Sequence, residues 1–312
     1  MEIVKQITPE METKLAGKTD RTYVFFKVTY NHFRDVSDST AHEVRDRYEP
    51  AECEAVLCLP ASYRAEGEKT PLILCCHGAG GLVREAEDKI GGVAYANRCI
   101  DEGFAVLDVN GSEWNGRSMG CPEHVMALYR AYRYAVKHYH LEERVMVAGG
   151  SMGGTTAVNF SNTFPGIVVA MGLIYPRLNI DGVTVGDHYC IGTWDKKEQY
   201  DESDGLKTPQ RIAKIFRFPT EEWYEPNTVG FNPYRGRSYV NEEGLRAVIP
   251  PCPVKLWQGL EDKTVDPVMV EEYAKSIKRA GCYAELHLLE GVAHKLTPVM
   301  REELMLWFDR FR

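Results

Sequence analysis

A serine flanked by glycines is the residue of this chain best placed to do chemistry. The segment G-G-S-M-G at 149–153 directly follows an apolar run, 144–148, and directly precedes a helix-compatible run. The chain must therefore reverse from strand to helix within one or two residues, and glycines suit the crowded backbone of such a turn. A serine at the tip of the turn exposes its hydroxyl at the end of a sheet. This placement predicts that Ser151 is the nucleophile of an ester- or amide-cleaving enzyme.

The same G-x-S-x-G pattern occurs a second time, around Ser118, and serves as a control. The preceding strand candidate, 104–109, is separated from it by the polar stretch 110–115, and Pro122 after it suits the first turn of a helix. We therefore expect Ser118 to lie in a loop. The context of the pattern, and not the pattern alone, selects Ser151.

The serine needs a base and an acid, and two loops offer them. Histidine is the usual base because its proton exchanges near neutral pH, and an acid must orient the imidazole and stabilise its charged form. In an open parallel sheet such groups meet at the carboxyl ends of strands. Asp262 follows the strand candidate 254–258, and His294 follows the strand candidate 283–289. The order Ser151, Asp262, His294 is typical of one superfamily of hydrolases.

Neighbouring residues compete for the role of the acid. Glu261 and Asp266 flank Asp262, and Glu261 is the nearer alternative. Asp266 is expected instead to cap the helix that begins at Pro267, because aspartate is favoured at that position. Three further histidines have structural interpretations, within a strand or at a helix end: His138, His140 and His287.

The negative charge that forms on an attacked carbonyl needs preorganised N–H donors. One predicted donor is the backbone N–H of Met152, at the start of the helix. The second is expected from the H-G-A-G-G loop at 77–81, with Ala79 favoured and Gly80 as the alternative. His77 is expected to orient this loop rather than to act as a base. A plain glycine-rich turn is the structural alternative for the loop.

The elements that must position these residues alternate along the chain. The strand candidates are 23–30, 53–60, 72–76, 104–109, 144–148, 167–174, 254–258 and 283–289. Helical patterns lie at 84–102, 122–139, 209–216 and 267–280, directly after the serine turn, and at the end of the chain. This alternation predicts an α/β fold with a mostly parallel central sheet and helices on both faces. Residues 1–70 are expected to supply strands that lead into the sheet.

Regular alternation lapses over residues 176–250, which carry Trp194, Trp223 and several tyrosines. We interpret this segment as an inserted cap or lid, because compact domains rarely hold so long an irregular stretch without a purpose. Surface packing with no substrate role is the alternative. His188 in the cap and Trp114 in the 110–120 loop are candidate substrate contacts, although a loop tryptophan is as often simply packed.

Composition sets the class of protein. With 312 residues, 44% hydrophobic content and a net charge of −8, the chain suits one large α/β domain over residues 1–312. The acidic balance argues against nucleic acid or an anionic membrane as a partner. The nine cysteines include no C-x-x-C pair, and the start of the chain does not resemble a signal peptide. The longest apolar stretch, at about 166–175, is too short to span a bilayer. These features predict a cytoplasmic protein.

No cofactor is expected from the motifs. The histidines are dispersed, no H-E-x-x-H occurs, and neither a dinucleotide fingerprint nor a P-loop is present. The glycines around Ser151 superficially resemble a phosphate loop, but the lysine of such a loop is missing. The sequence therefore predicts neither a metal ligand set nor a bound nucleotide.

Taken together, the motifs resemble those of the α/β-hydrolase superfamily, in its branch of prolyl-oligopeptidase-like hydrolases and acetyl xylan esterases. The segments that carry the resemblance are G-G-S-M-G-G at 149–154, H-G-A-G-G at 77–81, W-Q-G-L-E-D at 257–262 and G-V-A-H at 291–294. It covers about 72–312 and leaves the cap unmatched. The resemblance implies a Ser-Asp-His triad, an acyl-enzyme and no cofactor. Only about 70 residues precede the motifs, which argues against a propeller-gated oligopeptidase.

Three functions stay open at this point. The first is a carboxylic ester hydrolase acting on a small-molecule or carbohydrate ester, with removal of acetyl or feruloyl groups from a carbohydrate as the candidate reaction. The second is a serine peptidase or amidase of prolyl-oligopeptidase type, for which no obvious acidic pair announces recognition of a free amine. The third is a binding module or lyase on the same scaffold. The complete set of Ser151, Asp262 and His294 favours an enzyme, and the sequence does not give the oligomeric state.

Overall fold

The computed structural model describes most of the chain. The described residues are 5–6, 21–33, 48–83, 95–111, 118–193, 195, 200–201, 206–207, 210, 212, 215–216, 231–234 and 249–312. Trp114, Trp194 and Trp223 lie outside them, as do residues 84–94, the first part of the helix expected at 84–102. The later part of that expected helix is present as a shorter helix, α3.

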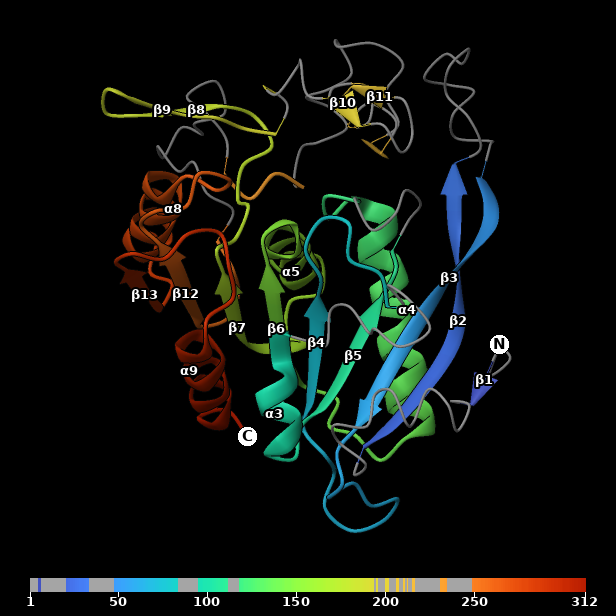
Figure 1. The fold of residues 1–312 in the computed structure, drawn as a ribbon. Helices are drawn as coiled ribbons and strands as arrows, with labels where there is room; N and C mark the ends of the chain where they lie inside the picture. The colour runs from blue at the N-terminus through green and yellow to red at the C-terminus, as the bar shows by residue number, and fades with distance from the viewer. Residues whose placement is uncertain are drawn as a thin grey trace.

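A nine-stranded sheet forms the centre of the fold (Figure 1). Its strands are β1 (Lys5–Gln6), β2 (Thr22–Phe33), β3 (Tyr48–Leu59), β4 (Leu72–Cys76), β5 (Ala105–Val109), β6 (Val145–Gly150), β7 (Val168–Ile174), β12 (Val254–Gly259) and β13 (Ala284–Leu289). Their order is β1-β2-β3-β5-β4-β6-β7-β12-β13. The pairs among β1, β2, β3 and β5 along this order are antiparallel, and every pair from β5 through β13 is parallel. The sheet is therefore mostly parallel, as the alternation of elements predicted.

The strand order reverses direction next to β4. The chain runs from β4 to β5 on one side and then returns to place β6 on the other side of β4. In open α/β sheets the crevice outside the carboxyl ends of the strands at such a switch point is where ligands bind. The loop at 77–81 and Ser151 leave the sheet there, from the ends of the neighbouring strands β4 and β6.

Helices cover both faces of the sheet. They are α3 (Asn97–Asp101), α4 (Pro122–His138), α5 (Met152–Thr163), α8 (Pro267–Arg279) and α9 (Pro298–Asp309). Side chains of α4, α5 and α8 pack in one hydrophobic core, and those of α3 and α9 pack in the other. Successive residues of β4 alternate between them, since Leu72 and Leu74 belong to the first core and Ile73 to the second. Because both faces are covered, the central strands are continuously apolar.

Small residues bring α5 close to the sheet. A Cβ added to Gly153 would lie 1.9 Å from the Cys76 carbonyl oxygen at the end of β4, and one added to Gly154 would lie 2.4 Å from Pro176 Cβ. A Cβ on Gly149 would in turn lie 2.3 Å from the carbonyl oxygen of Gly153. The strand before the turn also runs further than 144–148, because β6 continues through Gly150. The whole reversal therefore falls on Ser151.

The segment expected to form a cap contains two small hairpins within its described residues. β8 (Val183–Val185) pairs with β9 (His188–Cys190), and β10 (Tyr200–Asp201) pairs with β11 (Leu206–Lys207). Figure 1 places both hairpins beyond the carboxyl ends of the parallel strands. Of the helix expected at 209–216, the described residues 210, 212, 215 and 216 are helical. The role of this segment as a lid stays a prediction.

Two further observations concern the described helices and the cysteines. Among the described helices, none combines the length and the apolar character needed to cross a lipid bilayer. The nine cysteines are all free, and eight of them are buried.

The close contact of α5 with β4 makes a testable prediction. Replacing Gly153 by alanine should lower the free energy of unfolding by about 3 kcal/mol, because the new methyl group meets backbone that cannot move aside. Gly172→Ala is the matched control, since its Cβ would meet a methyl group of Leu304, the end of a flexible side chain. Urea unfolding of both variants measures the difference. Equal stability of the two variants would contradict this account of the packing.

Candidate active site

Ser151, His294 and Asp262 form one hydrogen-bonded chain at the carboxyl ends of three strands. His294 Nε2 lies 3.0 Å from Ser151 Oγ, and His294 Nδ1 lies 2.8 Å from Asp262 Oδ2. Ser151 directly follows β6, Asp262 lies in the loop after β12, and His294 lies in the loop after β13. When Nδ1 carries the proton that faces the carboxylate, Nε2 is free to accept the serine proton.

The backbone at Ser151 is strained where the chain reverses. Its φ of 53° and ψ of −121° lie in a region that costs a residue other than glycine about 1–3 kcal/mol. Hydrogen bonds on both sides hold this conformation: the Ser151 carbonyl accepts the N–H groups of Arg177 at 2.7 Å and Gly154 at 2.9 Å, and its own N–H donates to Ile174 at 3.1 Å. Since α5 begins at Met152, the N–H of Met152 has no acceptor within the helix.

The loop after β4 lies directly beside the serine. A Cβ added to Gly78 would be 3.6 Å from the Cβ of Ser151, so this backbone approaches the serine side chain closely. The loop closes in a turn in which the Gly81 N–H donates to the Gly78 carbonyl at 3.0 Å, with Gly80 at a φ of +81°. That turn bond uses neither the Ala79 nor the Gly80 N–H. Both therefore stay candidate donors to a negative oxygen at Ser151.

The carboxylate of Asp262 is held by several donors. Its Oδ1 accepts the backbone N–H groups of Thr264 at 2.8 Å and Val265 at 2.9 Å, and its Oδ2 accepts the Gln258 amide at 3.1 Å as well as facing His294. Burial raises the pKa of this carboxyl, but the hydrogen bonds from Val265, His294 and Thr264 outweigh burial and hold the pKa below its ordinary value. Asp262 is thus ionised and fixed in direction.

The structure separates Asp262 from its rivals. Asp266 caps α8 as predicted, because its Oδ1 accepts the Val268 N–H at 3.0 Å. Glu261 is exposed to solvent. His287 Nδ1 faces Glu303 Oε2 across 2.9 Å, in agreement with a structural role.

Ser118 lies in a buried loop, as predicted, and belongs to a separate polar network. Its Oγ hydrogen-bonds to Nδ1 of His124 on α4. Burial, together with the neighbouring His77, lowers the pKa of His124 to about 3, so this imidazole is neutral. The Nδ1 of His77 lies 3.1 Å from Asp108 Oδ1 on β5. His77 therefore ties the start of the 77–81 loop to the sheet, in the orienting role expected for it.

Two residues that the sequence did not single out flank the hydrogen-bonded chain. Gln258 contacts Asp262 as described above, and the ring of Tyr175 lies 4.4 Å from the ring of His294, centroid to centroid. Tyr175 itself has a φ of 36°, and its hydroxyl lies 3.4 Å from that of Tyr95. Gln258 ends an apolar strand run and Tyr175 directly follows another. Their position at strand exits is the signal that would have found them.

His188, the second candidate substrate contact, lies on β9 and pairs with Asp266. Its Nε2 is 2.7 Å from Asp266 Oδ2, and its side chain is 54% exposed. A substrate role for His188 stays a prediction.

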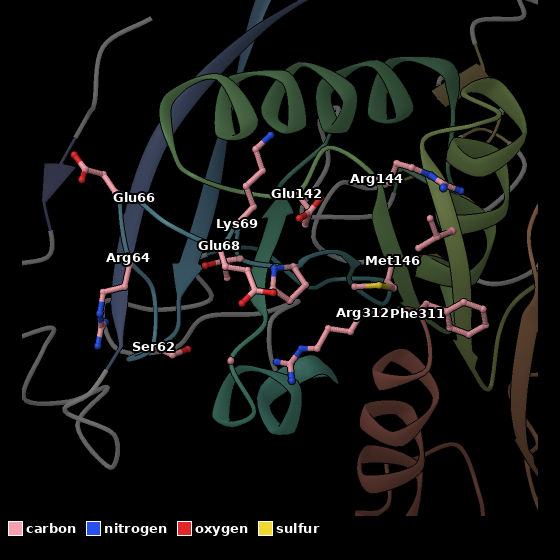
Figure 2. Close-up of a pocket in the computed structure, with 14 residues that line it drawn as sticks. Ser62, Arg64, Glu66, Glu68, Lys69, Glu142, Arg144, Met146, Phe311 and Arg312 are labelled. Atoms are coloured by element: carbon pink, nitrogen blue, oxygen red, sulfur yellow. The ribbon is translucent and has the colours of Figure 1, made fainter.

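A hollow of about 720 Å³ lies at the opposite end of the sheet (Figure 2). Its walls come from the segment ahead of β4, from the first residues of β6 and β7 and from the end of the chain, and they mix basic side chains such as Arg144 and Arg312 with acidic ones such as Glu68. Ser151 lies at the other end of β6, about 20 Å away for a strand of six residues. Ser62 is the serine in the wall of this hollow. The described residues of the wall include no histidine that could act as its base.

Comparison with solved structures identifies the fold. S-formylglutathione hydrolase from Agrobacterium tumefaciens superposes with a TM-score of 0.61 at 15% identity, over 100% of both chains. The carboxylesterase EstE1, cloned from a metagenomic library, gives a TM-score of 0.54 at 19% identity, over 89% of this chain and 86% of EstE1. The acylaminoacyl peptidase of Pyrococcus horikoshii gives 0.55 at 14% identity, over 92% of this chain. This chain spans 42% of that peptidase's length.

These likenesses, together with the strand order, show that the chain has the α/β-hydrolase fold expected from its motifs. No protein-family model matches the chain, and no curated protein matches it in sequence. Because the sequence identities lie between 14% and 19%, the structural similarity shows the fold and not the activity.

The hydrogen bonds around Asp262 predict a dependence of stability on pH. The folded pKa is lowered, so the ionised carboxyl stabilises the fold above the unfolded pKa of about 3.9, and this contribution is lost as pH falls through the folded pKa. Urea unfolding should therefore separate the wild type from Asp262→Asn near neutral pH, and the gap should close in acid. Asp309→Asn, on the surface near the end of the chain, controls for the change in net charge. A gap of the same size at every pH would contradict the prediction.

Proposed function

We propose that this protein is a serine hydrolase that cleaves carboxylic esters through an acyl-enzyme. The observation that carries the proposal is the continuous hydrogen-bonded chain from Ser151 Oγ through His294 to the buried Asp262. The strained turn at Ser151, the fixed carboxylate and the glycine loop beside the serine support the same conclusion, because each serves a separate need of acyl transfer.

In the proposed reaction, Ser151 Oγ attacks the ester carbonyl while its proton passes to His294 Nε2. Asp262 stabilises the imidazolium that results and does not itself take the proton. The N–H groups of Met152 and of Ala79, or of Gly80 in its place, would hold the oxyanion of the tetrahedral intermediate. The intermediate expels the alcohol, which takes the proton from His294 and leaves the acyl group on Ser151.

Water completes the cycle. His294 takes a proton from the water as the water attacks the acyl-enzyme carbonyl. The second tetrahedral intermediate then releases the acid, and Ser151 Oγ takes the proton back from His294.

The ester class is favoured over the amide class by the proteins of similar fold that match most of their own length. S-formylglutathione hydrolase and the carboxylesterase EstE1 are covered over 100% and 86% of their chains, whereas the acylaminoacyl peptidase is covered over 42% of its chain. An acetylated or feruloylated carbohydrate is the substrate class we propose to test within the esters. The similarity to the acylaminoacyl peptidase supports the alternative, an amidase that uses the same three residues.

Hydrolysis of 4-nitrophenyl acetate tests the proposal. Ser151→Ala should lower kcat by about 10⁴-fold or more, because the nucleophile is removed. Ser118→Ala is the matched control, since it removes the serine of the second G-x-S-x-G segment and leaves the hydrogen-bonded chain of Ser151 intact. Circular dichroism checks that both variants are folded. Ester turnover that survives in Ser151→Ala would overturn the proposal.

A proline-type peptide amide assayed in parallel separates the ester class from the amide class. Ester turnover without amide cleavage supports the esterase and leads next to acetylated and feruloylated sugars. Cleavage of the amide that disappears in Ser151→Ala would identify a peptidase with the same nucleophile.

The dependence of kcat/KM on pH provides an independent test. The rate should fall about tenfold for each pH unit once the imidazole of the free enzyme is protonated, because the charged ring cannot accept the serine proton. Since the pKa of Asp262 lies below its ordinary value, the acid stays ionised through this fall. A flat profile from neutral to acidic pH, in a protein shown to stay folded, would rule out His294 as the base.

A further inference from the structure

We propose that His188, Cys190 and Asp266 bind a divalent transition-metal ion, with Zn²⁺ as the best match. Each residue offers one ligand atom, namely a ring nitrogen of the histidine, the sulfur of the cysteine and a carboxylate oxygen of the aspartate, and these three atoms lie within 4.8 Å of one another. His188 Nε2 is 2.7 Å from Asp266 Oδ2. The proposal is separate from the esterase reaction and does not depend on it.

The local structure directs all three ligands to one point. His188 and Cys190 are two residues apart on β9, so their side chains leave the same face of the strand. Asp266 caps α8 through Oδ1, which accepts the Val268 N–H. Its second oxygen, Oδ2, faces His188 of the hairpin. The cap thus fixes the carboxylate, and the strand fixes the other two ligands.

The set of donor atoms suits zinc. Imidazole nitrogen, thiolate sulfur and carboxylate oxygen are the three ligand types that Zn²⁺ takes from proteins, and they are a poor match to Mg²⁺ or Ca²⁺, which prefer oxygen. Three protein ligands leave a fourth tetrahedral position for water. Cys190 is fully buried and His188 is half exposed, so the site has a closed side and a side open to the entry of an ion.

The proposed ion would join two parts of the chain that already meet at one buried cation. The guanidinium of Arg177 donates to the carbonyl of Ile191, next to the hairpin, and to the carbonyl of Thr264, in the loop of Asp262. A metal bound to β9 and Asp266 would clamp the same hairpin to the same loop. We therefore infer that metal binding stabilises the position of the β8–β9 hairpin against the loop that carries Asp262.

The motifs of the sequence did not reveal this group because its members are far apart. The histidine and the aspartate are 78 positions apart, and H-x-C alone is not a zinc pattern. Among the described residues, this is the one group of three such ligands that the fold brings together.

A calorimetric titration of the chelator-treated full-length chain with Zn²⁺ tests the proposal. We expect one ion per chain, and a dissociation constant raised at least about tenfold in His188→Ala and Cys190→Ser. His287→Ala is the matched control, because His287 also faces a carboxylate, Glu303, but belongs to no group of three ligands among the described residues. Cys282→Ser controls for thiols, since Cys282 is the least buried of the cysteines.

Spectroscopy and unfolding give readouts that do not depend on activity. Co²⁺ in the site should show a thiolate-to-cobalt charge-transfer band that disappears in Cys190→Ser, and Zn²⁺ should raise the Tm of the wild type but not that of His188→Ala. His188 is exposed, so this variant is expected to fold, and circular dichroism verifies it. Absence of stoichiometric binding, equal affinity in His188→Ala and wild type, or a cobalt spectrum without a thiolate band would show a hydrogen-bonded cluster only and overturn the proposal.

Discussion

The reversal of the chain at one residue, Ser151, is the constraint on which the rest of the site depends. A strand and a helix can meet across a single residue only if the helix lies almost on the sheet, and the missing side chains of Gly149 and Gly153 allow this contact. The cost is a backbone conformation that a serine rarely adopts. Hydrogen bonds from Arg177 and Gly154 to the Ser151 carbonyl offset it. The same strain points the hydroxyl away from the sheet and toward its partners.

Parallel pairing places the strand ends that carry Ser151, Asp262 and His294 at one level of the sheet. Gly150 at the end of β6 is level with Ile174 of β7, Ile174 is level with Trp257 of β12, and β12 and β13 end together at Gly259 and Leu289. Loops that leave neighbouring strands at one level need few residues to reach one another. Short loops have few conformations to lose, and the backbone N–H groups that bind Asp262 belong to such a loop. The precision of the site thus comes from the register of the sheet.

Residues that directly follow an apolar run could be predicted from the sequence, because a strand end is a local property. This holds for the sheet and its two layers of helices, for the turn at Ser151, and for the position of the loops of Asp262 and His294. The contacts of Gln258 could not be predicted in the same way, because they depend on where a loop folds back. The grouping of His188 with Asp266 depends on a hairpin docking against a distant helix, which no spacing along the chain encodes. The full length of β6 also differs from the pattern, since neighbouring elements decide where a strand ends.

The distance along the chain between the ends of the hydrogen-bonded chain has a consequence for folding. Ser151 and His294 are 143 positions apart, and β7 and β12 lie between β6 and β13 in the sheet. Contacts of such long range form late, because the entropy of closing the intervening loop is lost before the contact repays it. We therefore expect a folding chain to form the turn at Ser151 before the contact between Ser151 and His294. The reactivity proposed for Ser151 would then begin only when the edge strand β13 is in place, which would couple its onset to the completion of folding.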